Sequence, residues 1–171
     1  MLTVGLPEAD QARFDRERRA LFPPGRTVVG AHLTLFHALP GDRLHAIVDG
    51  LRSLGARPPL SMQVTGILSL GRGVAYRVES AALIALHRQL QQLWSDRLTR
   101  QDAQPLRPHI TVQNKVSPET ARQTMAELHA GFRPSGLVAV SLDLWEYVDG
   151  PWCPLGRFEF AGAAAETSPA Y

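Results

Sequence analysis

The sequence predicts one α+β domain of two similar lobes, each an antiparallel sheet with helices on its outside, around a central cleft. Three observations support this class. Strand-like and helix-like segments alternate along the chain, and glycine-containing turns indicate two hairpins. The order of motif strand, helix and hairpin occurs twice. The length of 171 residues fits a single domain, which we place at 1–161, followed by a flexible tail at 162–171.

The first part of the chain alternates between strand and helix. Residues 2–6 form a short apolar segment that a proline ends, which indicates a strand. Residues 8–22 have helical composition and stop at a Pro-Pro-Gly sequence. Residues 27–39 are β-branched and alternating, as in a half-buried strand. A helix is expected over 42–54, between an aspartate suited to an N-cap and a following glycine.

The middle of the chain predicts a hairpin and a helix. Residues 60–70 and 74–79 are strand-like and flank a Gly-Arg-Gly turn. Leucines then recur at helical spacing within 80–99, which predicts a helix with one buried stripe.

The last part repeats the order of the first. A strand is expected at 109–116, and a helix at 117–131 starts with a serine followed by proline. Strands at 137–148 and 155–160 form a final hairpin across an Asp-Gly turn. The two halves therefore share an order of elements, with little identity outside one short motif.

That motif is histidine, aliphatic, threonine, aliphatic, found at 32–35 and again at 109–112. Side chains alternate between the two faces of a strand, so each copy presents its histidine and threonine on one face and its aliphatic residues on the other. Histidine titrates near neutral pH and threonine donates a hydrogen bond. Two copies brought together would surround a small anion with groups that move protons and bind phosphate.

These tetrapeptides, their separation and the duplicated order resemble the two-histidine (2H) phosphoesterase superfamily, best known from bacterial 2′-5′ RNA ligases, or RNA 2′,3′-cyclic phosphodiesterases. The resemblance covers residues 1–160. It implies that the catalytic residues are His32 with Thr34 and His109 with Thr111. It further implies that His109 is the base and His32 the acid in hydrolysis. In the ligase branch an arginine commonly follows the second motif, where this chain has Gln-Asn-Lys.

The function expected from this resemblance is metal-independent hydrolysis of a 2′,3′-cyclic phosphate on an RNA end or a small nucleotide. The reverse reaction, 2′-5′ RNA ligation, uses the same groups and stays open. The alternative is a catalytically inactive nucleotide- or RNA-binding protein that keeps the phosphate pocket. No cofactor is expected. Neither motif histidine has a carboxylate three or four residues later, so the usual local spacing of a metal site is absent.

Four further residues are candidates for substrate binding. Phe36 continues the face of the first motif and could stack on a base. Gln113 and Lys115 continue the face of the second motif, and the lysine could meet a phosphate. Tyr76 lies on the hairpin strand that the pseudo-symmetry would bring near the cleft. The histidines outside the motifs have no repeated context and are interpreted as surface or half-buried residues, with His37 pointing away from His32.

Composition sets broad limits. The formal net charge is +2, which permits a nucleotide or nucleic-acid partner without requiring one. Cys153 is the only cysteine, so an intrachain disulfide is impossible. The first residues lack the basic and apolar regions of a signal peptide, and no segment has the apolar length of a membrane span. We therefore expect a cytoplasmic monomer that binds no membrane.

Overall fold

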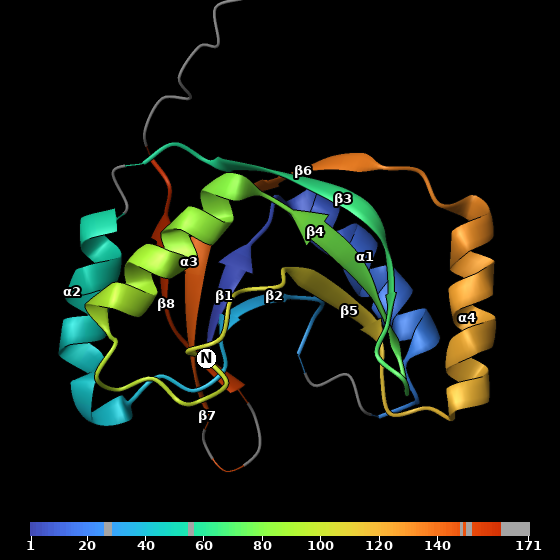
Figure 1. The fold of residues 1–171 in the computed structure, drawn as a ribbon, viewed down its shortest axis with the longest axis horizontal. Coiled ribbons are helices and arrows are strands. Elements are labelled where there is room, and N and C mark those ends of the chain that lie inside the picture. Colours follow the sequence, from blue (N-terminus) through green and yellow to red (C-terminus); the bar gives the residue numbers. More distant parts are fainter. Residues whose placement is uncertain (26–28, 55–56, 148, 150–151, 162–171) are drawn as a thin grey trace, which may run out of the picture.

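The structure is a computed structural model that describes residues 1–25, 29–54, 57–147, 149 and 152–161. Two four-stranded antiparallel sheets are flanked by helices (Figure 1), which confirms the predicted α+β class. The flexible tail predicted at 162–171 lies outside the described residues. None of the helices in the described ranges is long and apolar enough to cross a membrane.

Each sheet has one motif strand at its edge. The first sheet runs in the order β2 (Leu33–Phe36), β1 (Leu2–Gly5), β7 (Ser141–Tyr147) and β8 (Trp152–Glu159). The second sheet runs in the order β5 (His109–Gln113), β4 (Val74–Glu79), β3 (Leu60–Ser69) and β6 (Ser135–Ala139). The first motif runs from His32, just before β2, along that strand, and the second lies on β5, so each motif strand has a neighbouring strand on one side only.

The helices are α1 (Glu8–Leu21), α2 (Leu44–Leu54, preceded by a 3₁₀ turn at Gly41–Arg43), α3 (Ala81–Leu93) and α4 (Pro118–Gly131). Two of them begin at a capping serine, whereas α1 has no side-chain cap and the expected cap Asp42 lies within the 3₁₀ turn before α2. The hydroxyls of Ser80 and Ser117 accept amide hydrogen bonds at the starts of α3 and α4, which satisfies donors that a helix leaves free. Figure 1 shows α2 and α4 at opposite ends of the molecule.

The sheets do not correspond to the two halves of the chain. The hairpin β3–β4 follows the first motif but lies in the sheet of the second motif. The hairpin β7–β8 follows the second motif but completes the sheet of the first. In each sheet the motif strand pairs with the strand that precedes it across one helix, through β1–α1–β2 and β4–α3–β5. The repeated order therefore gives two interlocked sheets.

Some predicted boundaries were wrong. Residues 27 and 28 of the strand predicted at 27–39 lie outside the described residues, and from residue 29 on only Leu33–Phe36 form a strand. The strand predicted at 109–116 ends at Gln113, and the helix predicted at 80–99 ends at Leu93. The strand predicted at 137–148 is divided into β6 and β7 because the chain changes sheets at Val140. There the amide of Val140 donates to the carbonyl of Gly5 at 2.9 Å. A uniform apolar pattern does not reveal such a crossing.

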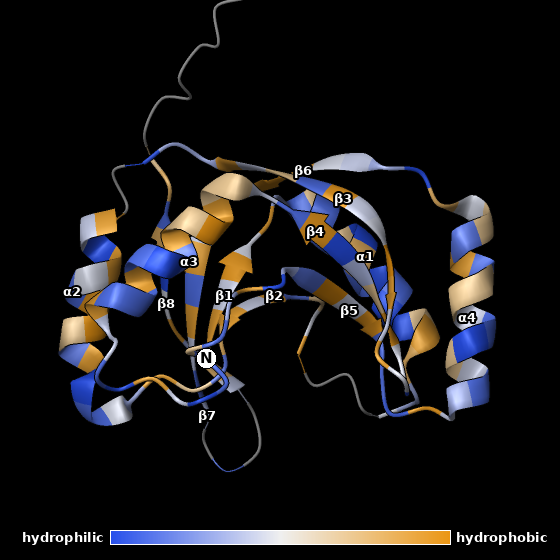
Figure 2. Cartoon of the chain, in the orientation of Figure 1, coloured by the Kyte–Doolittle hydropathy of each residue, from blue (hydrophilic) through white to orange (hydrophobic). Residues whose placement is uncertain are grey.

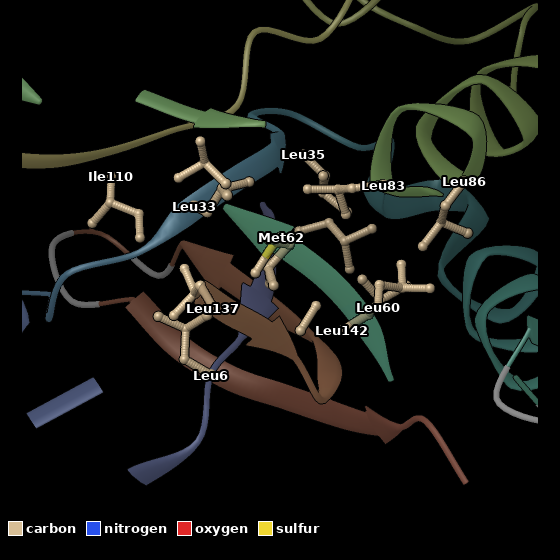
Figure 3. Close-up of a cluster of buried hydrophobic side chains, with 14 of the residues drawn as sticks. Leu6, Leu33, Leu35, Leu60, Met62, Leu83, Leu86, Ile110, Leu137 and Leu142 are labelled. Carbon is tan, nitrogen blue, oxygen red and sulfur yellow. The ribbon is translucent and has the colours of Figure 1, made fainter. Parts of the chain in front are cut away.

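One hydrophobic cluster joins the two sheets and α3. Figure 3 shows leucine, isoleucine and methionine side chains from β2, β3, β5, β6, β7 and α3 gathered together. Figure 2 shows α3 mostly hydrophobic in its first half and largely hydrophilic in its second half, and its buried residues include Leu83, Leu86 and Leu90. Full burial of such a side chain contributes about 1.5–3 kcal/mol. This shared core fixes the edges that carry the motifs.

Candidate active site

The two motif strands lie against each other where the edges of the sheets meet (Figure 1). The aliphatic residues of both motifs are buried, with Leu33, Ile110 and Val112 completely inaccessible. The four histidine and threonine side chains between them are half-buried. Burial of one face therefore holds each strand and leaves the polar face of both motifs at the junction.

Both motif histidines are oriented by the same local hydrogen bond. The Nδ1 atom of His32 lies 2.8 Å from the carbonyl oxygen of Gly30, and that of His109 lies 2.8 Å from the carbonyl oxygen of Arg107. A carbonyl oxygen only accepts, so Nδ1 of each ring carries the hydrogen. Each Nε2 is then the atom that is free to exchange a proton, and neither Nε2 bonds to another described residue.

The surroundings of His32 favour its neutral form. Burial lowers the pKa of His32 below its ordinary value, although its bond to Gly30 acts in the opposite direction. The positive charges of Arg18, His109 and His37 lower this pKa further. These charges act on His32 because they lie near it. The charge of His109 therefore acts on His32 across the junction of the sheets.

The threonines offer hydroxyl donors beside these rings. Thr34 pairs with Thr3 of β1, and Thr111 pairs with Ala75 of β4, so their backbones belong to the sheets. Within the described part of the chain, neither threonine hydroxyl has a hydrogen-bond partner. Both hydroxyls are thus available to a bound anion.

Arg18 is a buried charge that the sequence did not single out. Its side chain is 8% exposed, and Nη1 donates to the carbonyl of Thr111 at 2.6 Å. The guanidinium also stacks on Phe22, 4.1 Å from the ring centroid. Arg18 thereby ties α1 to the second motif strand and places positive charge near His32. The four-residue spacing of Arg18 and Phe22 on a helix indicates that their side chains can stack. It does not show that the Arg18 side chain binds the carbonyl of Thr111.

Each motif strand contains a one-residue bulge at the fourth position of its motif. Along β1 and β2, Thr3 pairs with Thr34 but Leu2 pairs with Phe36, so Leu35 is the extra residue. On β4 and β5 the same shift makes Val112 the extra residue. A bulge interrupts the alternation of faces, so the residue that follows it points the opposite way from the expected one.

The bulges overturn two of the sequence predictions. Phe36 was expected to face a base, but it is completely buried and stacks on His87 at 4.6 Å between ring centroids. Gln113 was expected to face the substrate, but it is 2% exposed and its amide donates to Thr124 at 2.8 Å. Both side chains support the motif strand from the interior and do not reach the site.

The remaining binding candidates lie outside the junction. Tyr76 is 8% exposed, and its hydroxyl donates to Glu17 at 2.7 Å. Burial and this bond raise the pKa of Tyr76. Lys115 follows the end of β5 and is exposed, with a left-handed backbone at φ 62°. It therefore does not continue the face of the second motif, and Tyr76 contributes to packing.

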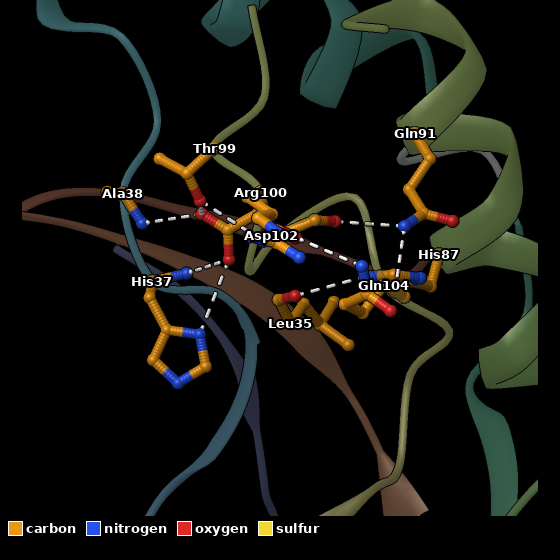
Figure 4. A network of polar contacts seen from close by, with 9 residues as sticks. All are labelled: Leu35, His37, Ala38, His87, Gln91, Thr99, Arg100, Asp102 and Gln104. Carbon is orange, nitrogen blue, oxygen red and sulfur yellow. Dashed lines mark hydrogen bonds and ion pairs between the residues drawn. The ribbon is translucent and has the colours of Figure 1, made fainter.

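His37 is the residue that the first bulge brings to the site. Its backbone amide donates to Oδ1 of Asp102 at 2.7 Å, and its Nδ1 lies 3.3 Å from the same oxygen (Figure 4). Oδ2 of Asp102 accepts from the amide of Ala38 and the hydroxyl of Thr99, both at 3.0 Å. The prediction that His37 points away from His32 assumed strict alternation, which the bulge at Leu35 interrupts.

Asp102 and His87 hold this bulge in place. Burial alone would raise the pKa of Asp102, but the hydrogen bonds it accepts keep the pKa below its ordinary value, so the carboxylate is ionised. His87, itself 2% exposed, lies with Nε2 3.2 Å from the carbonyl oxygen of Leu35, the bulged residue. Figure 4 shows both groups around the same stretch of chain. Their partners could not be inferred from sequence.

A cavity of about 410 Å³ lies beside the paired motifs. Its lining includes Thr34 from the first motif and His109 from the second, together with His37 and Arg107. His32 borders a different cavity, of about 540 Å³, with Asp143 and Arg157 among its walls. A third cavity, of about 730 Å³, also borders His109. The two motif histidines therefore line different cavities, and His109 borders two of them.

No group of three or more histidine, cysteine, aspartate or glutamate side chains is arranged to hold a metal ion within the described ranges. Cys153 is half-buried and has a free thiol. The chemistry that the site offers from its own residues is that of two imidazoles and two hydroxyls.

Solved structures with a similar fold cover nearly the whole chain. The protein TT0787 of Thermus thermophilus is 19% identical, with a TM-score of 0.64 over 95% of this chain and 98% of its own. E. coli LigT, in complex with 3′-AMP, is 20% identical, with a TM-score of 0.61 over 92% and 95%. A structure described as a phosphoesterase is also 20% identical, with a TM-score of 0.60 over the same shares. At these identities the likeness shows the fold.

Sequence comparison identifies the family more directly. No curated protein matches the chain significantly. Residues 6–151, which include both motifs, match the 2′-5′ RNA ligase superfamily. This match confirms the resemblance that the motifs indicated, and it supports an activity of the phosphoesterase and ligase type. The chain belongs to the 2′-5′ RNA ligase superfamily.

Proposed function

We propose that this protein is a phosphodiesterase that hydrolyses a 2′,3′-cyclic phosphate on an RNA end or a nucleotide without a metal ion. The observation that carries the proposal is the matched orientation of two histidines at adjoining sheet edges. In both, a carbonyl holds Nδ1 and leaves Nε2 free. Opening a cyclic phosphate needs one group to take a proton and another to give one.

Hydrolysis divides these tasks between the two rings. Neutral His32 takes a proton from the attacking water through Nε2 as the new phosphorus–oxygen bond forms. Protonated His109 gives a proton to the ribose oxygen as its bond to phosphorus breaks, and a phosphate monoester remains on the other oxygen. Burial lowers the pKa of His32 and favours its neutral form, which fits the role of base, whereas the family resemblance gives that role to His109.

Thr34 and Thr111 serve the phosphate itself. Their half-buried hydroxyls have no partner among the described residues and stand next to the two histidines. Hydrogen bonds to the non-bridging oxygens stabilise the charge that develops in the transition state. With the 5′-hydroxyl of a second RNA end in place of water, the same groups would form a phosphodiester bond to that hydroxyl as the bond from phosphorus to one ribose oxygen breaks, which is ligation.

The test is turnover of adenosine 2′,3′-cyclic phosphate by the purified protein with EDTA present. We expect hydrolysis to one phosphate monoester, with a bell-shaped pH profile that the chelator does not change. His45→Ala is the matched control, because His45 is exposed on α2, away from the junction. Activity that depends on a divalent metal, or that survives loss of either motif histidine, would contradict the proposal.

A binding measurement separates the enzyme from its alternative. An inactive nucleotide-binding protein would bind adenosine 3′-monophosphate in calorimetry but show no turnover of the cyclic compound. The proposed enzyme does both. A protein that neither binds nor hydrolyses would require a different ligand class altogether.

A further inference from the structure

His37 and Arg107 extend the site away from the two motifs. Both line the cavity of about 410 Å³ that also contains Thr34 and His109. Arg107 is exposed, and no carboxylate in the described parts of the chain pairs with its guanidinium. Its backbone carbonyl orients His109, so its side chain starts next to the catalytic histidine.

The His37 ring is held in a defined direction. Nδ1 faces Asp102, and Figure 4 shows the second ring nitrogen on the side away from this network. The imidazole remains 51% exposed, so this outer nitrogen is accessible to a ligand. An imidazole nitrogen that carries a hydrogen donates it to a phosphate oxygen.

The cavity carries no free negative charge among its lining residues. Asp102 is its only carboxylate, and the Asp102 side chain is 1% exposed. Both oxygens of this carboxylate are already occupied, by His37 on one side and by Ala38 and Thr99 on the other. The accessible formal charge of the cavity therefore comes from Arg107, and the outer nitrogen of His37 adds a hydrogen-bonding group beside it, which suits an anion.

We propose that His37, oriented by Asp102, and Arg107 form a second anion subsite, which binds the 5′-phosphate of the nucleotide whose 2′,3′-phosphate lies between the motifs. This inference rests on the proposed function for the identity of the reacting phosphate. The substrate class is then a nucleotide or RNA end that carries a phosphate on both sides of its terminal ribose. A nucleoside cyclic phosphate without the 5′-phosphate fills only part of the site.

The test compares two probes by calorimetry, adenosine 3′-monophosphate and adenosine 3′,5′-bisphosphate. We expect the wild type to bind the bisphosphate at least about tenfold more tightly, as one charged hydrogen bond allows. His37→Gln and Arg107→Gln should each remove most of this preference and leave the affinity for the monophosphate nearly unchanged. His45→Gln, a loss of an exposed imidazole elsewhere, should keep the preference.

The outcomes separate this inference from the proposed function. Equal affinity of the wild type for both probes, or a preference that survives in both glutamine variants, would overturn the subsite. A preference that disappears in both variants would support the subsite even if the cyclic phosphate is not hydrolysed, and only the proposed activity would then be wrong. Thermal unfolding of each variant verifies that the fold is kept, which the exposure of both side chains leads us to expect.

Discussion

The two motif strands share a backbone design and differ in what supports it. Both are edge strands, both fix their histidine through a carbonyl two residues earlier, and both bulge at the fourth motif position. After the first bulge, backbone amides donate to the ionised carboxylate of Asp102. After the second, the neutral side chain of Gln113 binds Thr124. The shared backbone places the catalytic groups, and the local support decides which further residue reaches the cavity.

The largest expected effect is on turnover, when one of the two motif histidines is removed. His32→Ala and His109→Ala should each lower kcat by roughly 10²–10⁴-fold, since each removes one proton-transfer group. The double variant should be little slower than either single one, because the rings act as a unit. Single-turnover rates with the cyclic nucleotide measure both effects. Independent, multiplicative losses would show that the two strands do not form one site.

Removing the threonine hydroxyls tests whether both strands hold the same phosphate. Thr34→Val and Thr111→Val keep the β-branched shape, so the fold should survive. Each should weaken the binding of adenosine 3′-monophosphate by about 1.5–3 kcal/mol, the contribution of a hydrogen bond to a charged group. Thr65→Val, on β3 and bonded to Glu79, is the matched control. Unchanged affinity in both motif variants would leave these threonines a purely structural role.

The support of the first strand is tested by replacing its carboxylate. In Asp102→Asn the amide nitrogen cannot accept a hydrogen bond, so one of the donors that Asp102 now binds is left buried without a partner. We expect the free energy of unfolding to fall by about 1–3 kcal/mol in urea titrations. Asp96→Asn, an exposed carboxylate in the turn after α3, should change little. Equal stability of the two variants would mean that Asp102 does not hold the bulge.

Much of this arrangement was predictable from sequence because it is local. The alternation of the motifs, the hairpin around residues 71–73 and the caps of α3 and α4 depend on neighbouring residues. The bulges depend on the register of β2 against β1 and of β5 against β4. This register cannot be read from the sequence of one strand alone. Phe36 and Gln113 were therefore assigned to the wrong face, and His37 was missed. Arg18 and Asp102 were missed because their partners are distant in sequence.

Lowering the pH should weaken the support of the first motif strand, which depends on the ionised carboxylate of Asp102. The pKa of Asp102 is lowered in the folded protein, so its contribution to stability is complete above the unfolded value of about 4. That contribution is lost as the pH falls from about 4 through the lower folded-state pKa. The stability difference between wild type and Asp102→Asn should therefore shrink below pH ~4. A constant difference would show that the charge of Asp102 contributes nothing.

The smallest expected effect is a change in the pKa of His32, which tests how its surroundings act on it. Arg18→Met should raise the pKa of His32, because it removes a nearby positive charge that lowers this pKa in the wild type. Burial of the ring remains and continues to lower the pKa. Titration of the His32 ring by NMR measures the shift, and the matching limb of the pH–rate profile should move upward with it. Arg19→Met removes an exposed charge from the same helix and should leave His32 unaffected. An unmoved His32 pKa would contradict the influence of Arg18.

The exchange of hairpins between sheets has a consequence for how the chain folds. In the first sheet β1 lies between β2 and β7, and Leu2 pairs with Leu144. Contacts between such distant positions are slow to form, because closing a long loop costs conformational entropy before the strand pairing contributes stability. The second sheet can pair β3, β4 and β5 once the middle of the chain has left the ribosome. The first sheet must wait for the final hairpin, so its β7–β8 side, which supports β1 and β2, is completed last during synthesis.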